Sequence, residues 1–290
     1  MNTTDFEYLA AFLMKRSGMS LRPEKEYLVN SRLIPVARSV DLNSIEELVQ
    51  ALREGRNSEL ERIVTEAMTT NETLFFRDKT PFEELKDVLL PALTRARAEE
   101  RRLRIWCAAA STGQEPYSIA MVLHDAVPSL QNWDVEIVAT DISHEVLKRS
   151  EEGLYSQFEV QRGLPIQLLI KHFQQCGAEW QIKDHLRERI RFQYLNLLSN
   201  FSHLGKFDIV FCRNVLIYFD IETKRDVLDR IKRTMADDGY LLLGAAETVM
   251  GITGEFERYR TCKSGVYTPA QNGRLNWPAP VDSRVLPVNA

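Results

Sequence analysis

Residues 104–120, R-I-W-C-A-A-A-S-T-G-Q-E-P-Y-S-I-A, constrain the fold most, because an apolar run meets a loop of small residues that leads into a helix start. The run at 105–107 suits a buried strand, and the small side chains at 108–113 let the backbone approach a bound molecule closely. Pro116 fits a first helical turn, where its missing N–H costs nothing. The stretch therefore predicts either a ligand-binding strand, loop and helix or an ordinary strand-to-helix turn of a parallel sheet.

Further apolar runs of strand length alternate with helical patterns along the chain. They occur at 135–140, 207–212 and 240–244. This alternation predicts an α/β fold with a parallel sheet. The helix expected at 223–235 is followed by a stop signal, D-D-G at 237–239. Two segments near the C-terminus, 255–260 and 263–268, instead predict an antiparallel hairpin.

Polar residues follow several of these strands, at the edge where open α/β sheets bind ligands. Asp141 follows the second strand and either accepts hydrogen bonds from a ribose or caps the helix that begins D-I-S-H-E. Asn196-Leu197 and Arg213-Asn214 follow later strands. Neither G-x-G-x-x-G nor G-x-x-x-x-G-K-[ST] occurs in the chain. A nucleoside without phosphates, such as S-adenosylmethionine, is therefore favoured over dinucleotides and triphosphates.

Length and composition indicate an ordinary soluble protein with one large and one smaller domain. Of the 290 residues, 44% are hydrophobic, and the net charge of −4 argues against a general nucleic-acid binder. No apolar run approaches the roughly 20 residues that span a bilayer, and no signal pattern opens the chain, so we expect a cytoplasmic protein without membrane insertion. The cysteines form no C-x-x-C pair, which fits neither a metal site nor a disulfide framework.

We expect three parts: a helical N-terminal domain at 1–68, an α/β domain at 69–269 with a β-insertion at about 176–193, and a flexible tail at 270–290. The insertion is predicted from two short strands at 180–183 and 190–194 around a charged turn. Apolar periodicity predicts helices throughout 4–68. Their basic residues are Lys15, Arg16, Arg22, Lys25, Arg32 and Arg38. This basic stripe is either a solvated helix face or a dock for an acidic partner helix.

Five motifs, in order along the chain, match those of one known family. They are T-N-E-T-L-F-F-R-D, A-A-A-S-T-G-Q-E-P-Y-S-I-A, A-T-D-I-S, F-Q-Y-L-N-L-L and F-D-I-V-F-C-R-N-V-L-I-Y-F-D. On these motifs the chain resembles the chemotaxis receptor methyltransferases, the CheR family, from about residue 5 to 268. The resemblance implies a class I S-adenosylmethionine-dependent methyltransferase fold, Rossmann-like with a terminal antiparallel hairpin, plus a small helical N-terminal domain and an inserted β-subdomain. It also implies O-methylation of glutamate side chains on the cytoplasmic helices of chemoreceptors, which yields S-adenosylhomocysteine and serves chemosensory adaptation.

Carried over by motif, the cofactor contacts of the family fall on Asn71, Thr73, Arg77, Glu115, Asp141, Asn196, Leu197, Arg213 and Asn214. The resemblance implies that Glu115 helps to hold the amino-acid part of the cofactor and that Asp141 holds the ribose. It places the adenine at Asn196-Leu197.

Arg77 and Tyr218 are implied to lie near the transferable methyl group, where they would be the catalytic residues that orient the acceptor carboxylate. Gln114 stands where many family members have a second glutamate, so Glu115 is the one acidic residue of the motif at 108–120. The hairpin predicted around 180–191 is short, so we expect weak or no binding of a tethering peptide from the receptor C-terminus. We expect a monomer without a metal.

Two other functions stay open on the sequence. A nicotinamide-dependent oxidoreductase could use a similar sheet, although the missing glycine fingerprint argues against it. A non-catalytic regulatory module of a chemosensory pathway could bind S-adenosylmethionine with the same residues. A methyl-transfer assay with labelled cofactor and receptor fragments separates the enzyme from the module.

Overall fold

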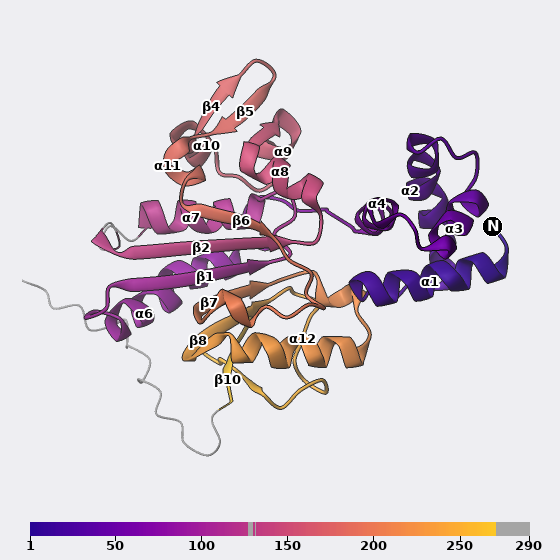
Figure 1. Ribbon diagram of the computed structural model, residues 1–290. Coiled ribbons are helices and arrows are strands. Elements are labelled where there is room, and N and C mark those ends of the chain that lie inside the picture. The colour runs from indigo at the N-terminus through magenta and orange to yellow at the C-terminus, as the bar shows by residue number, and fades with distance from the viewer. Residues whose placement is uncertain (127–129, 131, 271–290) are drawn as a thin grey trace, which may run out of the picture.

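The computed structural model of the chain describes residues 1–126, 130 and 132–270. Figure 1 shows a group of helices beside a larger α/β domain. The N-terminal helices are α1 (Thr3–Ser17), η1 (Pro23–Lys25), α2 (Glu26–Ser39), α3 (Ile45–Glu54) and α4 (Ser58–Met68). The helices expected within 4–68 are therefore present. The predicted tail lies outside the described residues, apart from Ala270.

Side-chain caps and a separate apolar core define the helical domain. Asn2, Ser44 and Asn57 each accept a hydrogen bond from a backbone N–H in the first turn of a helix, which satisfies a donor that the helix itself leaves free. The buried core consists of Leu9, Leu13, Val29, Leu33, Val36, Ala37, Ile45, Leu48, Val49, Leu52, Leu60, Val64 and Met68. Because all of these residues belong to the four long helices, the bundle has a core of its own.

Seven strands form the main sheet in the order β6-β2-β1-β7-β8-β10-β9. They are β1 (Arg102–Ala108), β2 (Asp134–Asp141), β6 (Ile190–Tyr194), β7 (Phe207–Cys212), β8 (Met235–Leu243), β9 (Phe256–Arg258) and β10 (Gly265–Pro269). The strands from β6 to β8 pair in parallel, and β10 pairs antiparallel with β8 and β9. This arrangement confirms the Rossmann-like fold with a terminal antiparallel hairpin.

Strand β1 is buried on both faces of the sheet. Ile105 and Cys107 pack in one apolar cluster with residues of α7 (Gln114–Ala126), whereas Trp106 packs in a second cluster with residues of α12 (Ile221–Arg233). Successive side chains of a strand point to opposite faces, so a strand covered on both sides needs a nearly continuous apolar run. This requirement explains the run that opens the sequence motif at 104–120.

The remaining helices of the α/β domain are short, apart from α8. They are α5 (Thr80–Glu84), the π-helical turn η2 (Leu85–Leu89), α6 (Leu90–Ala96), α8 (His144–Glu152), α9 (Gln157–Gln161), α10 (Ile166–His172), α11 (Asp184–Arg187), η4 (Ser202–Leu204) and η5 (Leu216–Tyr218). Across the described ranges, no helix combines the length and apolar character that crossing a membrane requires.

The β-insertion differs from the prediction in its boundaries. The small sheet has the order β3-β5-β4, and its strands are β3 (Leu154–Ser156), β4 (Phe173–Cys176) and β5 (Glu179–Ile182). The predicted partner of β5, the strand at 190–194, is instead β6 and pairs in parallel with β2, while α11 connects β5 to β6. An apolar–polar alternation identifies a strand but carries no information about its partner, which is why the prediction failed.

The end of α12 also differs from the prediction. The helix ends at Arg233, and the D-D-G segment at 237–239 lies inside β8 rather than in a turn. The Arg97 guanidinium donates hydrogen bonds to both carboxylate oxygens of Asp238, at 2.8 and 2.5 Å, and so anchors this part of the strand. The segment is an irregular part of β8, because Met235 pairs with Phe207 and the next pair along the strand is Tyr240 with Ile209.

Candidate functional site

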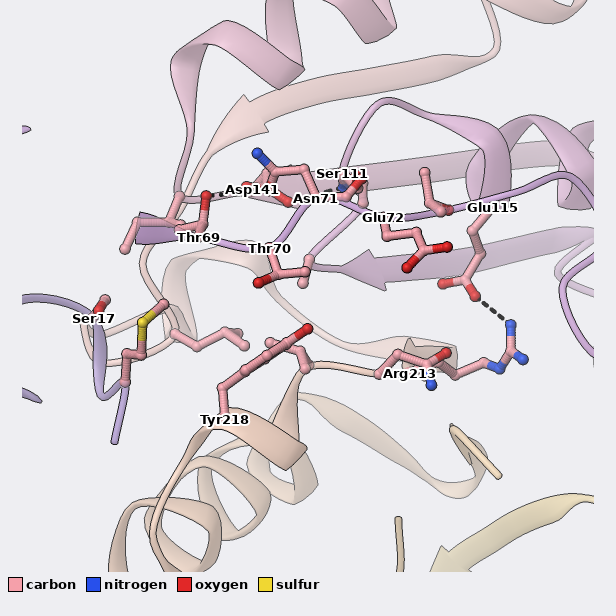
Figure 2. Close-up of a pocket in the computed structure, with 18 of the residues that line it drawn as sticks. Ser17, Thr69, Thr70, Asn71, Glu72, Ser111, Glu115, Asp141, Arg213 and Tyr218 are labelled. Atoms are coloured by element: carbon pink, nitrogen blue, oxygen red, sulfur yellow. Dashed lines mark hydrogen bonds and ion pairs between the residues drawn. The ribbon is translucent and has the colours of Figure 1, made fainter. Parts of the chain in front are cut away.

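A cavity opens at the carboxyl ends of the parallel strands, where β1, β2, β6 and β7 end at the same edge of the sheet. Its volume is about 960 Å³ when the space at its mouth is included. All the site residues singled out from the sequence line it, namely Asn71, Thr73, Arg77, Glu115, Asp141, Asn196, Leu197, Arg213, Asn214 and Tyr218. Figure 2 shows Asp141, Glu115 and Tyr218 reaching the cavity from different elements.

The loop after β1 brings backbone to the cavity wall. Ala109, Ala110 and Ser111 line the cavity, and Ala109 and Ser111 have left-handed backbone with φ of 61° and 51°. Gly113 has φ of 93°, and a Cβ there would lie 3.0 Å from the Tyr155 hydroxyl. Glycine is therefore required at this position both by its backbone conformation and by its packing.

Asp141 ends β2 with its carboxylate held by backbone donors. Its two oxygens accept hydrogen bonds from the N–H of Ser111 at 2.8 Å and of Ser143 at 3.0 Å. Burial raises the pKa of the Asp141 carboxyl, although these hydrogen bonds act in the opposite direction. The alternative that Asp141 caps the next helix is wrong, because Ser143 is the N-cap of α8 and its side chain accepts from Val146 N–H.

Glu115 forms a buried ion pair that the sequence analysis did not foresee. Arg213 donates to the Glu115 carboxylate at 2.6 Å, to the Asp78 carboxylate at 2.7 Å and to the carbonyl oxygen of Arg77 at 3.0 Å. The Arg213 side chain is only 1% exposed. Burial raises the pKa of the Glu115 carboxyl, and the positive charge of Arg213 counters that effect. The Arg213 guanidinium, just after β7, thus joins the segment at 77–78 to the first turn of α7.

Glu247 holds the loop that carries two of the predicted site residues. Its carboxylate accepts hydrogen bonds from the backbone N–H groups of Asn214, Val215, Ile217 and Gly244, at 2.7, 3.0, 3.3 and 2.7 Å. Asn214 has left-handed backbone with φ of 60°, so the loop depends on these contacts. The sequence analysis missed Glu247, although an acidic residue shortly after a buried strand was the signal that led to Asp141.

The helical domain closes one side of the cavity. It and the segment after α4 contribute the lining residues Ser17, Met19, Thr69 and Thr70, which the sequence analysis did not assign. The side-chain amide of Asn196 donates to the carbonyl oxygen of Arg16 at 2.6 Å, and Ser20 N–H donates to the carbonyl oxygen of Tyr218 at 2.9 Å. A Cβ at Gly18 would lie 3.1 Å from Phe219, so the two domains pack closely here.

The segment at 69–78 divides its residues between the core and the cavity. Phe75 is fully buried and packs edge-on against Tyr155 with ring centroids 5.0 Å apart. Asn71, Thr73 and Arg77 line the cavity instead. This division explains why polar residues and adjacent phenylalanines occur together in a stretch that joins two domains.

Among the described residues, no group of three or more histidine, cysteine, aspartate or glutamate side chains is arranged to hold a metal ion. The cavity combines a small-residue loop, a buried acid after the second strand and polar groups after two further strands, at the edge of a Rossmann-like sheet. This combination, in a chain without the glycine fingerprint of dinucleotide-binding sheets, is typical of the class I S-adenosylmethionine-dependent methyltransferases.

Comparison with known proteins identifies the family. The model described as "CheR methyltransferase, all-alpha domain" matches residues 4–69, and the model described as "CheR methyltransferase, SAM binding domain" matches residues 71–264. The chain is 43% identical over 266 residues to chemotaxis protein methyltransferase 1 of Pseudomonas aeruginosa, covering 90% of this chain and 96% of the relative. It is 41% identical over 271 residues to chemotaxis protein methyltransferase Cher2 of Pseudomonas putida, covering 92% and 98%. The protein therefore belongs to the CheR methyltransferase family, as the sequence motifs predicted.

Proposed function

We propose that this protein methylates glutamate side chains on the cytoplasmic helices of chemoreceptors, with S-adenosylmethionine as the methyl donor. The observation that carries the proposal is that site residues from all five sequence motifs line one cavity. The names of the relatives support the link to chemotaxis. We further propose that the protein acts as a cytoplasmic monomer that needs neither a metal nor nucleic acid.

The lining of the cavity fits the parts of this cofactor. Asp141 would hold the ribose, and Asn196 and Leu197 would border the adenine. Glu115 and Arg213 would hold the amino-acid end, where a zwitterion needs both charges. Arg213 Nε is buried and has no hydrogen-bond partner among the described residues. Asn71, Thr73, Arg77 and Asn214 complete the proposed set of cofactor contacts.

The proposed reaction needs no general base. A glutamate carboxylate has an ordinary pKa of about 4.3, so it is already ionised at neutral pH. Bound S-adenosylmethionine supplies the methyl group: a carboxylate oxygen forms the new bond to the methyl carbon as the sulfur–carbon bond breaks, leaving a methyl ester and S-adenosylhomocysteine. The protein must hold that oxygen in line, and positioning of this kind can supply about 7–11 kcal/mol.

Arg77 and Tyr218 are proposed to orient the acceptor carboxylate. Arg77→Ala and Tyr218→Phe should each lower kcat/KM for methyl transfer by about 10²-fold, because small errors in alignment cost that much. The measurement uses labelled S-adenosylmethionine and a receptor cytoplasmic fragment. Tyr218→Phe should leave the Kd for the cofactor nearly unchanged.

Arg95→Ala is a matched control for these variants, because Arg95 is exposed on α6 and donates only to the carbonyl oxygen of Pro91. Near-normal turnover in both Arg77→Ala and Tyr218→Phe would overturn the assignment. Cofactor binding without any methyl transfer by the unaltered protein would favour the regulatory module instead.

Only some residues of the basic stripe have side chains available for the proposed receptor contact. Arg16 forms an ion pair with Glu61, and Arg32 donates to the carbonyl oxygens of Met68 and Thr69, so both have roles within the fold. The other four basic residues make no side-chain hydrogen bond or ion pair with the described part of the chain; they are Lys15, Arg22, Lys25 and Arg38. We propose that these four face the acidic receptor helices.

Binding of a tethering peptide from the receptor C-terminus is expected to be weak or absent. The edge strands of the small sheet are β3, with 3 residues, and β4, with 4 residues. An added peptide strand would therefore gain few main-chain hydrogen bonds. Calorimetric titration with a receptor C-terminal peptide checks this, and micromolar affinity would contradict it.

A further inference from the structure

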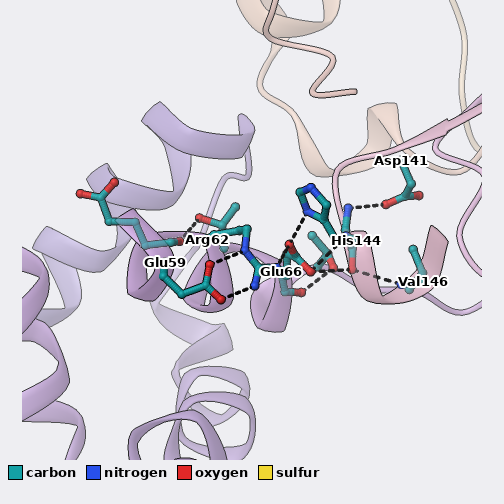
Figure 3. A network of polar contacts seen from close by, with 10 residues as sticks. Glu59, Arg62, Glu66, Asp141, His144 and Val146 are labelled. Carbon is teal, nitrogen blue, oxygen red and sulfur yellow. Dashed lines mark hydrogen bonds and ion pairs between the residues drawn. The ribbon is translucent and has the colours of Figure 1, made fainter. Parts of the chain in front are cut away.

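The carboxylate of Glu66 reaches from the helical domain into the α/β domain. Glu66 lies in the last turn of α4 and its side chain is 9% exposed. One oxygen accepts hydrogen bonds from the Ser143 hydroxyl and from the His144 backbone N–H, both at 3.1 Å. The other accepts from Arg62 at 2.5 Å and lies 3.0 Å from Nδ1 of His144. Figure 3 shows this network at the junction of the domains.

The residues that Glu66 holds also hold Asp141. Ser143 N–H donates to the Asp141 carboxylate at 3.0 Å, while its hydroxyl donates to Glu66. The loop at 141–144 is therefore fixed between two carboxylates, one at the cavity wall and one from the helical domain. Figure 3 shows Asp141 and Glu66 on opposite sides of this loop.

Two further contacts connect Glu66 to the cavity. The His144 ring stacks on the Tyr194 ring with centroids 4.5 Å apart and planes 19° apart, and Tyr194 directly precedes the lining residues at 195–197. The carbonyl oxygen of Glu66 accepts from the backbone N–H and the hydroxyl of Thr69, at 3.1 and 2.6 Å, and Thr69 lines the cavity. The Glu66 carboxylate thus supports two parts of the cavity wall, the loop at 141–144 and the segment after Tyr194, while the contact with Thr69 uses the backbone carbonyl that any residue at position 66 would supply.

The ionisation of Glu66 suits an acceptor of several hydrogen bonds. Burial alone would raise the pKa of its carboxyl, but hydrogen bonds from His144, Arg62 and Ser143 outweigh burial and lower the pKa. The carboxylate is therefore charged at neutral pH, where charge-assisted hydrogen bonds are the stronger kind.

We propose that Glu66 is a positioning residue of the cofactor site, which holds the loop at 141–144 from the helical domain so that Asp141 meets the nucleoside in a fixed orientation. The inference rests on the proposed function, since it takes the nucleoside to be that of S-adenosylmethionine. It gives the helical domain a part in cofactor binding, in addition to any contact with the receptor.

The test compares cofactor binding and turnover in Glu66 variants of the full chain. Glu66→Ala should raise the Kd for S-adenosylmethionine, measured by calorimetry without receptor, by about tenfold, because several hydrogen bonds to a charged group are lost. Glu66→Gln should raise it less, since an amide keeps one accepting oxygen. With saturating cofactor, kcat should stay near that of the unaltered protein, because the proposed catalytic residues are not moved. A merely structural role would not produce this split between KM for the cofactor and kcat.

Glu59→Gln is the matched control. Glu59 lies on the same helix and also accepts a hydrogen bond from Arg62, at 2.5 Å, but it is 62% exposed and lies outside the network to the loop at 141–144. Its variant should bind the cofactor as the unaltered protein does. Ser143→Ala should raise the cofactor Kd in the same direction as Glu66→Ala, and it replaces that variant if Glu66→Ala does not fold.

An unchanged cofactor Kd in folded Glu66→Gln and Ser143→Ala would overturn the inference and leave the proposed function intact. An equal loss in Glu59→Gln would also overturn it, because the effect would then come from Arg62. Failure of the unaltered protein to bind S-adenosylmethionine would overturn the proposed function, and the inference with it.

Discussion

Replacing Arg213 with methionine is expected to lower the free energy of unfolding by about 3–5 kcal/mol, because it removes one partner of a buried ion pair. Methionine fills part of the same volume but leaves the Glu115 carboxylate, 12% exposed, without its cation. The Asp78 carboxylate is 40% exposed and should contribute much less. Urea unfolding followed by circular dichroism measures the change. The variant should also bind S-adenosylmethionine more weakly, since both residues line the cavity.

The loss should depend on pH. Burial raises the pKa of the Glu115 carboxyl and Arg213 opposes that rise, so the substitution raises the pKa further. A carboxyl whose pKa is higher in the folded than in the unfolded protein binds more protons when folded, and its contribution to stability is lost as the pH rises through the folded pKa. The deficit of Arg213→Met relative to the unaltered protein should therefore be smaller at about pH 5 than at about pH 8.

A second substitution provides the control. Glu115→Gln in the Arg213→Met background removes the unpaired charge, so the double variant should be more stable at neutral pH than Arg213→Met alone. It should also lose the pH dependence of the deficit. Equal stability of Arg213→Met and the unaltered protein at about pH 8 would show that the pair contributes little to folding.

Replacing Glu247 with alanine is expected to lower the free energy of unfolding by about 3 kcal/mol, because four backbone N–H groups lose their shared acceptor and each buried donor left without one costs about 1–3 kcal/mol. Water that enters the space should recover part of the loss. The loop at 214–218 should relax, and Asn214 in particular should leave its left-handed conformation. Because Tyr218 lies on this loop, methyl transfer should fall by about 10²-fold.

Glu247→Gln tests the same contacts with nearly constant volume. The glutamine amide keeps one accepting oxygen and directs an N–H₂ group at backbone donors, so its effect should approach that of alanine. Glu257→Gln, an exposed glutamate of β9, is the control and should change neither stability nor turnover. Turnover of Glu247→Gln close to that of the unaltered protein would contradict the role of Glu247 in holding the loop.

The sequence was sufficient for those features that depend on neighbouring residues. The apolar runs identified β1, β2 and β7, because a strand buried on both faces needs such runs. The order of polar residues after those strands predicted which side chains would share one edge of the sheet, because parallel strands end together. The resemblance supplied Arg77 and Tyr218, which lie on segments without a regular pattern of their own. Their roles, like those of the other site residues, remain predictions.

Other features depend on residues far apart in the chain, and there the local pattern was insufficient. The strand at 190–194 has the same alternation whether it pairs with β5 or with β2, so its partner could not be predicted. Segment 237–239 has the composition of a turn, but in the structure it forms an irregular part of β8 between the residues that pair with β7, and Arg97 binds it through Asp238. Glu115 was identified as a site residue, yet its ion pair with Arg213 spans 98 positions along the chain.

By itself, the sequence determined the α/β class, the helical N-terminal domain, the family and the residues that meet at the strand ends, because periodicity and ordered motifs are local properties. Only the tertiary structure decided how those residues are held. Glu66 and Glu247 are single acidic residues in otherwise ordinary stretches, and their local partners, Arg62 and the N–H of Gly244, do not reveal the distant groups that each carboxylate also holds. Their importance arises because folding buries each carboxylate against backbone donors of a distant loop, and a buried charge must then be matched by the groups that surround it.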